Sequence, residues 1–189
     1  MTRIVAGSAG GRRLRVPPAG TRPTSDRVRE ALFSALDARL DLDGARVLDL
    51  YAGSGALGLE ALSRGAGHAL LVESDRKAAA VIRGNITDLG LPGAELRQGA
   101  VASILRQGGA GEFDLVFSDP PYDVDTTVVA DDLRLLADHG WLAPGALVLV
   151  ERSIRSPELT WPREYTPAKA RKYGETRIEL AEYDGPTEP

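Results

Sequence analysis

Short strand-like segments alternate with amphipathic helical segments along most of this chain. Strands are expected at Arg46–Leu50, His68–Glu73, Ala94–Gln98, Phe113–Ser118 and Ala146–Glu151. Helices are expected between them, at Ala56–Ser63, Asp75–Leu89, Val101–Arg106 and Thr126–Asp138. Apolar strands that alternate with helices are typical of a parallel sheet covered by helices. The pattern therefore predicts an α/β fold with a mostly parallel sheet.

The two ends of the chain depart from this alternation. Arg3–Ala6 and Arg12–Val16 predict a short hairpin, and apolar residues at helical spacing predict a helix over Ser25–Leu40, capped by Thr24 or Ser25. Tyr165–Arg171 and Arg177–Tyr183, joined by a turn at residues 174–175, predict a closing antiparallel hairpin. We therefore expect a seven-stranded sheet in residues 41–185, preceded by a hairpin-and-helix extension in residues 1–40.

Composition narrows the class of protein. The length of 189 residues suits one domain, and the absence of cysteine excludes disulfides, zinc–thiolate sites and cysteine nucleophiles. No metal site is expected. Without a signal-peptide pattern or a long apolar stretch, the chain is expected to be soluble and cytoplasmic.

Charge is distributed unevenly. The net charge is −4, but the first 30 residues carry seven arginines against two acidic residues, so this segment is +5 and the remainder −9. Lys169, Arg171 and Lys172 form a second basic group beside Tyr173. A basic end on an acidic body is expected of a directed contact with a polyanion such as RNA; the alternative is a solvated end with scattered arginines.

The sequence Asp119-Pro120-Pro121-Tyr122 follows directly after the apolar run Phe113–Ser118. The two prolines cannot donate sheet hydrogen bonds, and they stiffen the backbone where it leaves the sheet. A carboxylate, a carbonyl oxygen and an aromatic ring are thereby fixed where open α/β sheets bind ligands. These groups suit a planar amine, which would donate its N–H groups and stack on the ring. The alternative is a proline-rich turn with an N-cap aspartate.

A glycine pattern, Gly53-x-Gly55-x-x-Gly58, lies between the strand Arg46–Leu50 and the next helix. Glycines there allow a tight turn, close approach of a ligand, and close packing of helix on strand. This glycine pattern also occurs in dehydrogenases. Here, however, Asp49 lies inside the strand before the loop and Glu73 ends the next strand, and these details differ from a dinucleotide-binding site. A carboxylate in the position of Glu73 suits two ribose hydroxyls.

Together these motifs resemble the class I, Rossmann-like S-adenosylmethionine-dependent amino-methyltransferases. The chain ends narrow the resemblance to the RsmD family, which methylates the N2 amine of one guanine in 16S ribosomal RNA. The residues that carry it are Arg3–Gly7, Gly11–Leu14, Arg22–Phe33 and Lys172–Thr176. The resemblance implies that the substrate is RNA in the 30S subunit or its assembly intermediate. The acidic body of the chain allows a monomer and nothing in the sequence points to an interface, so a monomer is expected.

The resemblance also implies roles for individual residues. Asp119 and the carbonyl of Pro120 would accept the N–H groups of the target amine, Pro121 would stiffen the loop, and Tyr122 would stack on the base. The cofactor residues would be Asp49, Tyr51, Ala52, Gly53, Ser54, Gly55, Glu73, Ser74, Ala100, Thr24 and Asp26. The RNA-binding residues would be Arg3, Arg12, Arg13, Arg15, Arg22, Arg27, Lys169, Arg171, Lys172 and Tyr173.

Three of these assignments stay open. Asp49 either meets the amino-acid end of the cofactor or braces the glycine loop. Thr24 and Asp26, with Arg27, either cap a helix or lie near the cofactor. After the third strand, Gln98-Gly99-Ala100-Val101 lacks the acidic or amide side chain that many relatives place against adenine at the turn. Adenine would then be held by backbone amides, apolar packing, or the side chains of Ser74, Asp75 or Gln98.

Other functions remain open at this point. Related enzymes with the same motif methylate adenine or cytosine amines in DNA, or glutamine side chains in proteins. DNA enzymes usually need a separate target-recognition region, and the glutamine enzymes usually begin the motif with Asn rather than with an aspartate such as Asp119. A further alternative is a non-catalytic ribosome-assembly protein that binds RNA, which an assay for cofactor binding would separate.

Overall fold

The computed structural model of this chain describes residues 2–18 and 24–189. It separates into two compact units, Met1–Gly99 and Ala100–Pro189. The sequence predicts a different division, between an extension in residues 1–40 and a domain in residues 41–185. That division stays a prediction.

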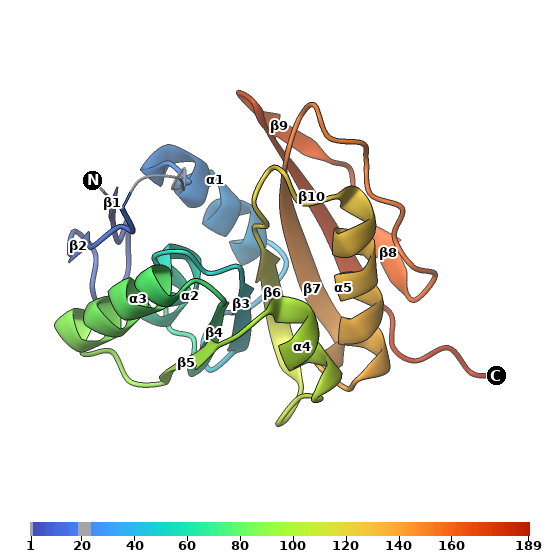
Figure 1. Cartoon of the computed structure of the whole chain (residues 1–189), viewed down its shortest axis with the longest axis horizontal. Coiled ribbons are helices and arrows are strands. Elements are labelled where there is room, and N and C mark those ends of the chain that lie inside the picture. The colour runs from blue at the N-terminus through green and yellow to red at the C-terminus, as the bar shows by residue number, and fades with distance from the viewer. Residues whose placement is uncertain (1, 19–23) are drawn as a thin grey trace. The chain divides into compact units, whose positions relative to one another are not determined.

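The first unit contains three parallel strands. Their order across the sheet is β5 (Ala94–Gln98), β4 (His68–Glu73) and β3 (Arg46–Leu50), connected through the helices α2 (Ala56–Ser63) and α3 (Arg76–Leu89) (Figure 1). Leu50 pairs with Val72, and Glu73 pairs with Gln98. The carboxyl ends of these strands therefore meet at one edge, where the glycine loop follows β3.

The amino-terminal extension forms as expected but with shorter strands. β1 (Thr2–Arg3) and β2 (Arg13–Leu14) pair antiparallel, and α1 (Asp26–Asp37) follows. The N-cap is Ser25, whose side chain accepts a hydrogen bond from Val28 N. The helix buries Leu32, Phe33 and Leu36 along one face, which confirms the helical spacing of the apolar residues.

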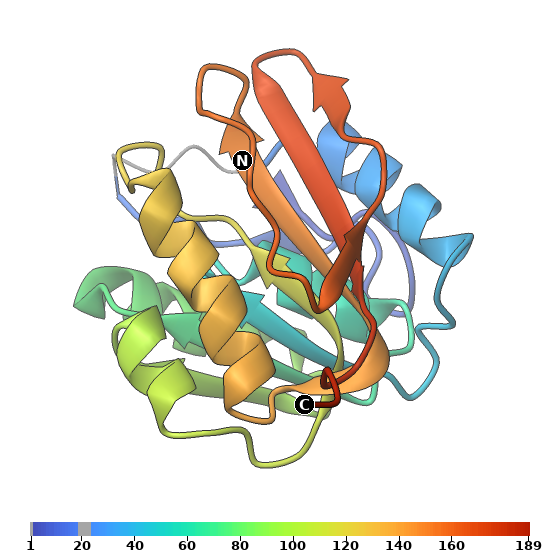
Figure 2. The same cartoon turned by 90° about the vertical axis from the view of Figure 1, so that its right-hand side faces the viewer.

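The second unit contains the helices α4 (Val101–Arg106) and α5 (Thr126–Asp138) and five strands. The strands are β6 (Phe113–Ser118), β7 (Leu142–Ser153), β8 (Tyr165–Pro167), β9 (Arg171–Tyr173) and β10 (Thr176–Tyr183). β6 and β7 are parallel, whereas β10 runs antiparallel to β7, β8 and β9. Figure 2 shows β7 and β10 as long neighbouring ribbons in orange and red.

The closing hairpin differs from the prediction in one respect. The expected strand Tyr165–Arg171 is divided into β8 and β9, so the described residues form eight sheet strands besides the amino-terminal pair, rather than seven. Ala181 pairs with Pro167 and Ile178 with Arg171, so three residues of one strand oppose two of the other. This extra residue interrupts the ladder as a β-bulge does.

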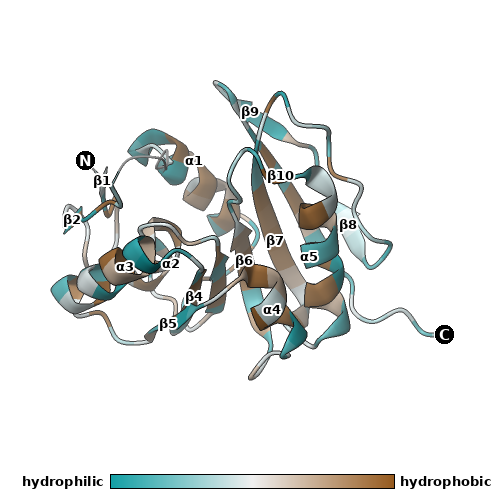
Figure 3. Cartoon of the chain, viewed as in Figure 1, coloured by the Kyte–Doolittle hydropathy of each residue, from teal (hydrophilic) through white to brown (hydrophobic). Residues whose placement is uncertain are grey.

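The strand interiors form the cores of both units. Val47, Leu48 and Leu50 of β3 are fully buried, as are Val148 and Val150 of β7. Figure 3 shows these strands predominantly as apolar ribbon. Their nearly continuous apolar sequence predicts this burial on both faces of the sheet. Polar side chains that take part in chemistry are therefore expected at the strand ends and in the loops that follow them.

Candidate functional site

In the first unit, each glycine of the pattern Gly53-x-Gly55-x-x-Gly58 has a separate structural role. Gly53 and Gly55 have φ angles of 60° and 82°, in the left-handed region that favours glycine. A Cβ on Gly53 would meet no atom within 4 Å, so the loop is open there to a ligand. A Cβ on Gly58 would lie 2.8 Å from Leu71, so this glycine lets α2 pack closely on the strands. The tight turn and the close helix packing predicted for these glycines are thus present, and the close approach of a ligand stays a prediction.

Tyr51 adds strain to the start of the same loop. It is the non-glycine residue with a positive φ, 58°, among residues 2–18 and 24–189. The turn that follows is closed by a hydrogen bond of 2.7 Å from Gly55 N to Ala52 O. A left-handed bulky residue is uncommon and persists where surrounding contacts fix it, frequently at a ligand site.

Glu73 holds the glycine loop directly. Its Oε1 accepts from Gly53 N at 2.8 Å, and its Oε2 accepts from Asp75 N at 2.9 Å. Each carboxylate oxygen has a second acceptor position, so two remain for the hydroxyls of a ribose. The structure thus brings together Glu73 and Gly53, which lie 20 residues apart in the sequence. Ser74, which follows Glu73, is exposed.

Asp49 braces the loop from inside β3. Its Oδ2 accepts a hydrogen bond of 2.9 Å from Gly58 N, and the residue is only 1% exposed. Burial raises the pKa of this carboxyl to about 8; the Gly58 hydrogen bond lowers it, and the nearby negative charge of Glu73 raises it further. Asp49 therefore braces the glycine loop, which is one of the two roles predicted for it. Contact between Asp49 and the cofactor stays a prediction.

The raised pKa of Asp49 predicts a pH-dependent stability. Between about pH 4 and pH 8 the folded chain retains a proton that the unfolded chain has released, so the free energy of unfolding falls as pH rises through this range. Asparagine at this position can still accept from Gly58 N but cannot titrate. Urea unfolding from pH 5 to pH 8 should therefore show the native protein losing stability relative to Asp49→Asn. A constant difference between the two proteins would contradict this prediction.

The second unit carries the Asp119–Tyr122 motif on the loop between β6 and α5. Asp119 is half-buried and Pro120 buried, whereas Tyr122 is 47% exposed. A turn follows, in which Val124 N donates to Pro121 O at 3.0 Å. Asp125 then caps α5 by accepting from Thr127 N at 2.8 Å, and this bond lowers the pKa of its carboxyl. The aspartate that caps the helix is therefore Asp125 and not Asp119.

The sequence interpretation missed Arg152, which holds this loop. Arg152 lies on β7 and is 2% exposed, and its Nη2 donates to Val124 O at 2.8 Å. Val124 is only two residues beyond Tyr122, so the buried guanidinium fixes the far end of the motif loop. The signal was an arginine in a continuously buried apolar strand, a position where a charge is costly without partners.

We expect Arg152→Lys to lower kcat/KM for the predicted RNA substrate about 10- to 150-fold, because a hydrogen bond to a charged group contributes about 1.5–3 kcal/mol. The lysine keeps the charge but cannot reproduce the fork of the guanidinium. Steady-state kinetics measure the effect. The matched control is Arg155→Lys, whose side chain is 79% exposed and pairs with Glu175 at 3.4 Å, and it should leave the kinetics unchanged. Equal kinetics for Arg152→Lys and the native protein would contradict the positioning role.

The predicted RNA-binding residues lie on both units. The exposed ones are Arg3, Arg12, Arg13, Arg15, Arg27, Lys169, Arg171 and Lys172, while Tyr173 is half-buried. Arg12 Nη2 donates to Asp88 O at 2.6 Å, and Arg15 Nε lies 3.0 Å from Asp88 Oδ2. Arg22 lies outside the described residues. The exposed positions are compatible with contact to a polyanion, and the contact itself stays a prediction.

Asp26 makes its contacts within the amino-terminal extension. Its Oδ1 accepts from Arg29 Nη2 at 2.9 Å, and its Oδ2 lies 3.9 Å from Arg3 Nε. Thr24 is half-buried just before the N-cap of α1, and Ala100 is the exposed N-cap of α4. The roles of these three residues at the cofactor stay predictions.

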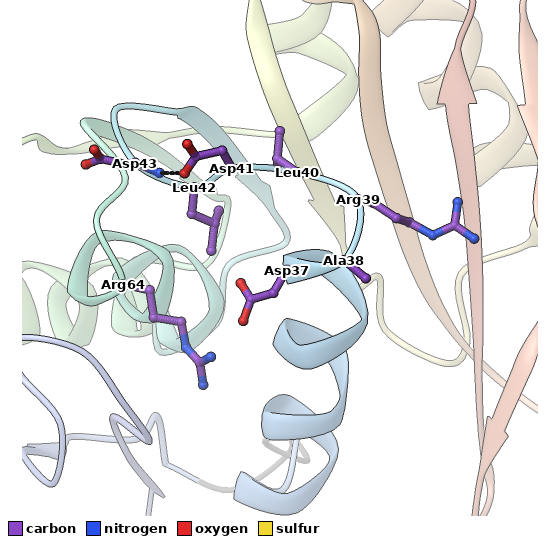
Figure 4. A pocket seen from close by; sticks show the side chains of 8 residues that line it. All are labelled: Asp37, Ala38, Arg39, Leu40, Asp41, Leu42, Asp43 and Arg64. Carbon is purple, nitrogen blue, oxygen red and sulfur yellow. Dashed lines mark hydrogen bonds between the residues drawn. The ribbon is translucent and has the colours of Figure 1, made fainter.

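A surface hollow lies at the end of α1. Residues 37–43 and Arg64 line it, and Asp43 N donates to Asp41 Oδ1 at 3.0 Å within its wall (Figure 4). None of the lining residues belongs to the glycine loop, and Glu73 is not among them. The hollow is therefore separate from the predicted cofactor residues.

Residues 2–18 and 24–189 contain no group of three or more histidine, aspartate or glutamate residues arranged to hold a metal ion. Within the same ranges, no helix combines the length and the apolar character needed to cross a membrane.

Comparison with known proteins places these motifs in a family. The family described as Conserved hypothetical protein 95 matches residues 2–182. The chain is 40% identical over 179 residues to ribosomal RNA small subunit methyltransferase D of Escherichia coli K12, covering 94% of this chain and 88% of that protein. It is 35% identical to the protein of the same name from Haemophilus influenzae, over 91% of this chain and 89% of that one.

Solved structures agree with the sequence comparison. The Escherichia coli protein yhhF, which carries the provisional name of a methyltransferase, superposes with a TM-score of 0.84 at 36% identity, covering 98% of this chain and 99% of that one. A hypothetical protein of Thermus thermophilus gives a TM-score of 0.80 at 34% identity, over 95% and 98% of the two chains. The expected Rossmann-like class I fold is thereby confirmed. The chain belongs to the Conserved hypothetical protein 95 family, the RsmD family of methyltransferases.

Proposed function

We propose that this enzyme transfers a methyl group from S-adenosylmethionine to the exocyclic N2 amine of a guanine in 16S ribosomal RNA. The substrate would be the 30S subunit or its assembly intermediate, and the enzyme would act as a monomer in the cytoplasm. The observation that carries the proposal is the Asp119–Tyr122 loop after β6, with Tyr122 47% exposed, in a chain whose relatives are named small-subunit rRNA methyltransferases.

The residues of the glycine loop fit the cofactor. The space beside Gly53 is open, and the carboxylate of Glu73 has acceptor positions left for two ribose hydroxyls. When bound, S-adenosylmethionine supplies a methyl group on a sulfonium, which is a good leaving group. The backbone of residues 51–55 would hold its methionine part, and Glu73 would hold its ribose.

The motif loop would prepare the methyl acceptor. The lone pair of a guanine amine is conjugated with the ring, which makes it a poor nucleophile. Asp119 and the carbonyl of Pro120 would each accept one N–H and turn the nitrogen lone pair toward the methyl group. The reaction would then depend on the orientation of the amine toward the methyl group rather than on strong acid–base catalysis. Tyr122 would hold the base by stacking, worth about 1–3 kcal/mol.

The exposed basic residues would bind the RNA backbone. Arg12, Arg13 and Arg15 lie together on the segment that includes β2, and Lys169, Arg171 and Lys172 form the second group. Phosphate contacts from such residues position RNA and make its affinity dependent on salt. The target base would still have to leave its stack, which costs a few kcal/mol and less in a loop.

A methyl-transfer assay with a panel of substrates tests the proposal. Tritium-labelled S-adenosylmethionine would be offered with 30S subunits from a strain lacking this enzyme, naked 16S rRNA, DNA and protein. We expect label in the RNA of the subunits. Label in DNA or protein would overturn the RNA assignment, and cofactor binding without transfer to any of the four would favour an assembly protein.

A further inference from the structure

Asn85 is a buried side chain that the proposed reaction does not use. It lies on α3 with no exposed surface, at a position where the helix otherwise buries apolar residues such as Ile82 and Leu89. Its Nδ2 donates to Ser54 O at 2.8 Å and to Arg15 O at 3.0 Å, and its Oδ1 accepts from Arg15 N at 2.8 Å. One amide thus joins the glycine loop to the amino-terminal extension.

A second set of contacts ties the same extension to the helix that follows the glycine loop. Val5 N and Ala6 N donate to the carboxylate of Glu60 at 2.8 and 3.1 Å, and Ala9 N donates to Ser63 Oγ at 2.9 Å. Glu60 and Ser63 belong to α2, whose N-cap is Gly55 of the loop. The extension is therefore fixed to the glycine loop through α3 and to the helix α2 that the loop begins.

The segment held by Asn85 carries exposed charge. The side chain of Arg15 is 64% exposed, and its ion pair with Asp88 lies at the surface. Exposed pairs of this kind contribute little stability, so a phosphate can replace Asp88 as the partner of the guanidinium. The backbone of Arg15 is hydrogen-bonded to Asn85, whereas its head group is available for exchange.

We propose that Asn85 is a positioning residue that couples cofactor binding at the glycine loop to RNA binding by the basic extension. This inference rests on the proposed function. A cofactor that orders the loop at Ser54 also restricts Asn85, and through it the backbone of Arg15. RNA then binds a segment that is already ordered, and by linkage the RNA strengthens cofactor binding by the same factor.

Binding measurements on the native protein and Asn85→Asp test the coupling. The variant keeps an acceptor for Arg15 N but loses both donors, and Thr87→Ala, at an exposed position of the same helix, is the control. The dissociation constant for 30S subunits from a strain lacking the enzyme is measured with and without S-adenosylhomocysteine. We expect the ligand to tighten binding about fivefold or more in the native protein and control, and by less than about twofold in Asn85→Asp. An unchanged ratio in a folded Asn85→Asp would overturn the inference.

Hydrogen exchange on the native protein keeps the test independent of whether the variant folds. We expect S-adenosylhomocysteine to slow exchange of the Arg15 amide, which donates to Asn85. Ligand binding without any change at this amide would overturn the coupling and leave the proposed function standing. Failure of the native protein to bind S-adenosylhomocysteine or S-adenosylmethionine would instead overturn the proposed function, and the inference with it.

Discussion

Replacing Asp119 with alanine should lower kcat for methyl transfer by about 100-fold or more, the size of effect seen when one preorganised polar group is lost from an active site. The proposed reaction needs the carboxylate to turn the amine lone pair toward the methyl group. The dissociation constant for S-adenosylmethionine should stay nearly unchanged, because the residue faces the acceptor. Single-turnover kinetics and calorimetric titration measure the two quantities.

Two further variants sharpen this result. Asp119→Asn keeps one acceptor oxygen, so we expect an activity between those of the native protein and Asp119→Ala. Asp131→Ala removes an exposed carboxylate on α5 that forms a surface ion pair with Arg134, and it should leave kcat unchanged. A collapse of cofactor affinity in Asp119→Ala would show that the residue serves the cofactor rather than the acceptor.

Replacing Glu73 with alanine should have the opposite signature. It removes the acceptor for Gly53 N and Asp75 N and the proposed partner of the ribose hydroxyls. Because hydrogen bonds to charged groups contribute about 1.5–3 kcal/mol, we expect affinity for S-adenosylmethionine to fall about 10- to 150-fold. Calorimetric titration measures this loss directly.

The control for Glu73 is a carboxylate on the neighbouring strand. Glu95 lies on β5 with a side chain that is 50% exposed, and Glu95→Ala should bind the cofactor as the native protein does. Circular dichroism should confirm that both variants fold. Unchanged cofactor affinity in a folded Glu73→Ala would refute the assignment of this residue to the ribose.

Local patterns in the sequence predicted the glycine loop well. The spacing of Gly53, Gly55 and Gly58 after an apolar strand is set by short-range sterics, and the observed φ angles and Cβ clearances agree with it. The position of Glu73 beside Gly53 was predictable because parallel strands end at the same edge of a sheet. The choice between two roles for Asp49 was not, because it depends on the hydrogen bond to Gly58.

Long-range contacts explain what the sequence interpretation missed. Asn85 and Arg152 donate to backbone carbonyls 31 and 28 residues away, and a backbone carbonyl leaves no trace in the amino-acid sequence. Each occupies a buried position in an otherwise apolar series, and that was the available signal. The division of the closing strand into β8 and β9 depends on one extra residue opposite β10. The β-sheet propensities of the individual residues do not predict where such an extra residue falls.

Nucleoside analysis of the methylated RNA tests the central claim most directly. RNA from 30S subunits treated with the enzyme and S-adenosylmethionine would be digested to nucleosides and separated by liquid chromatography with mass spectrometry. The proposed reaction predicts N2-methylguanosine as the new product, absent when Asp119→Ala replaces the native protein. Methylated adenosine or cytidine in its place would contradict the assignment of the guanine amine.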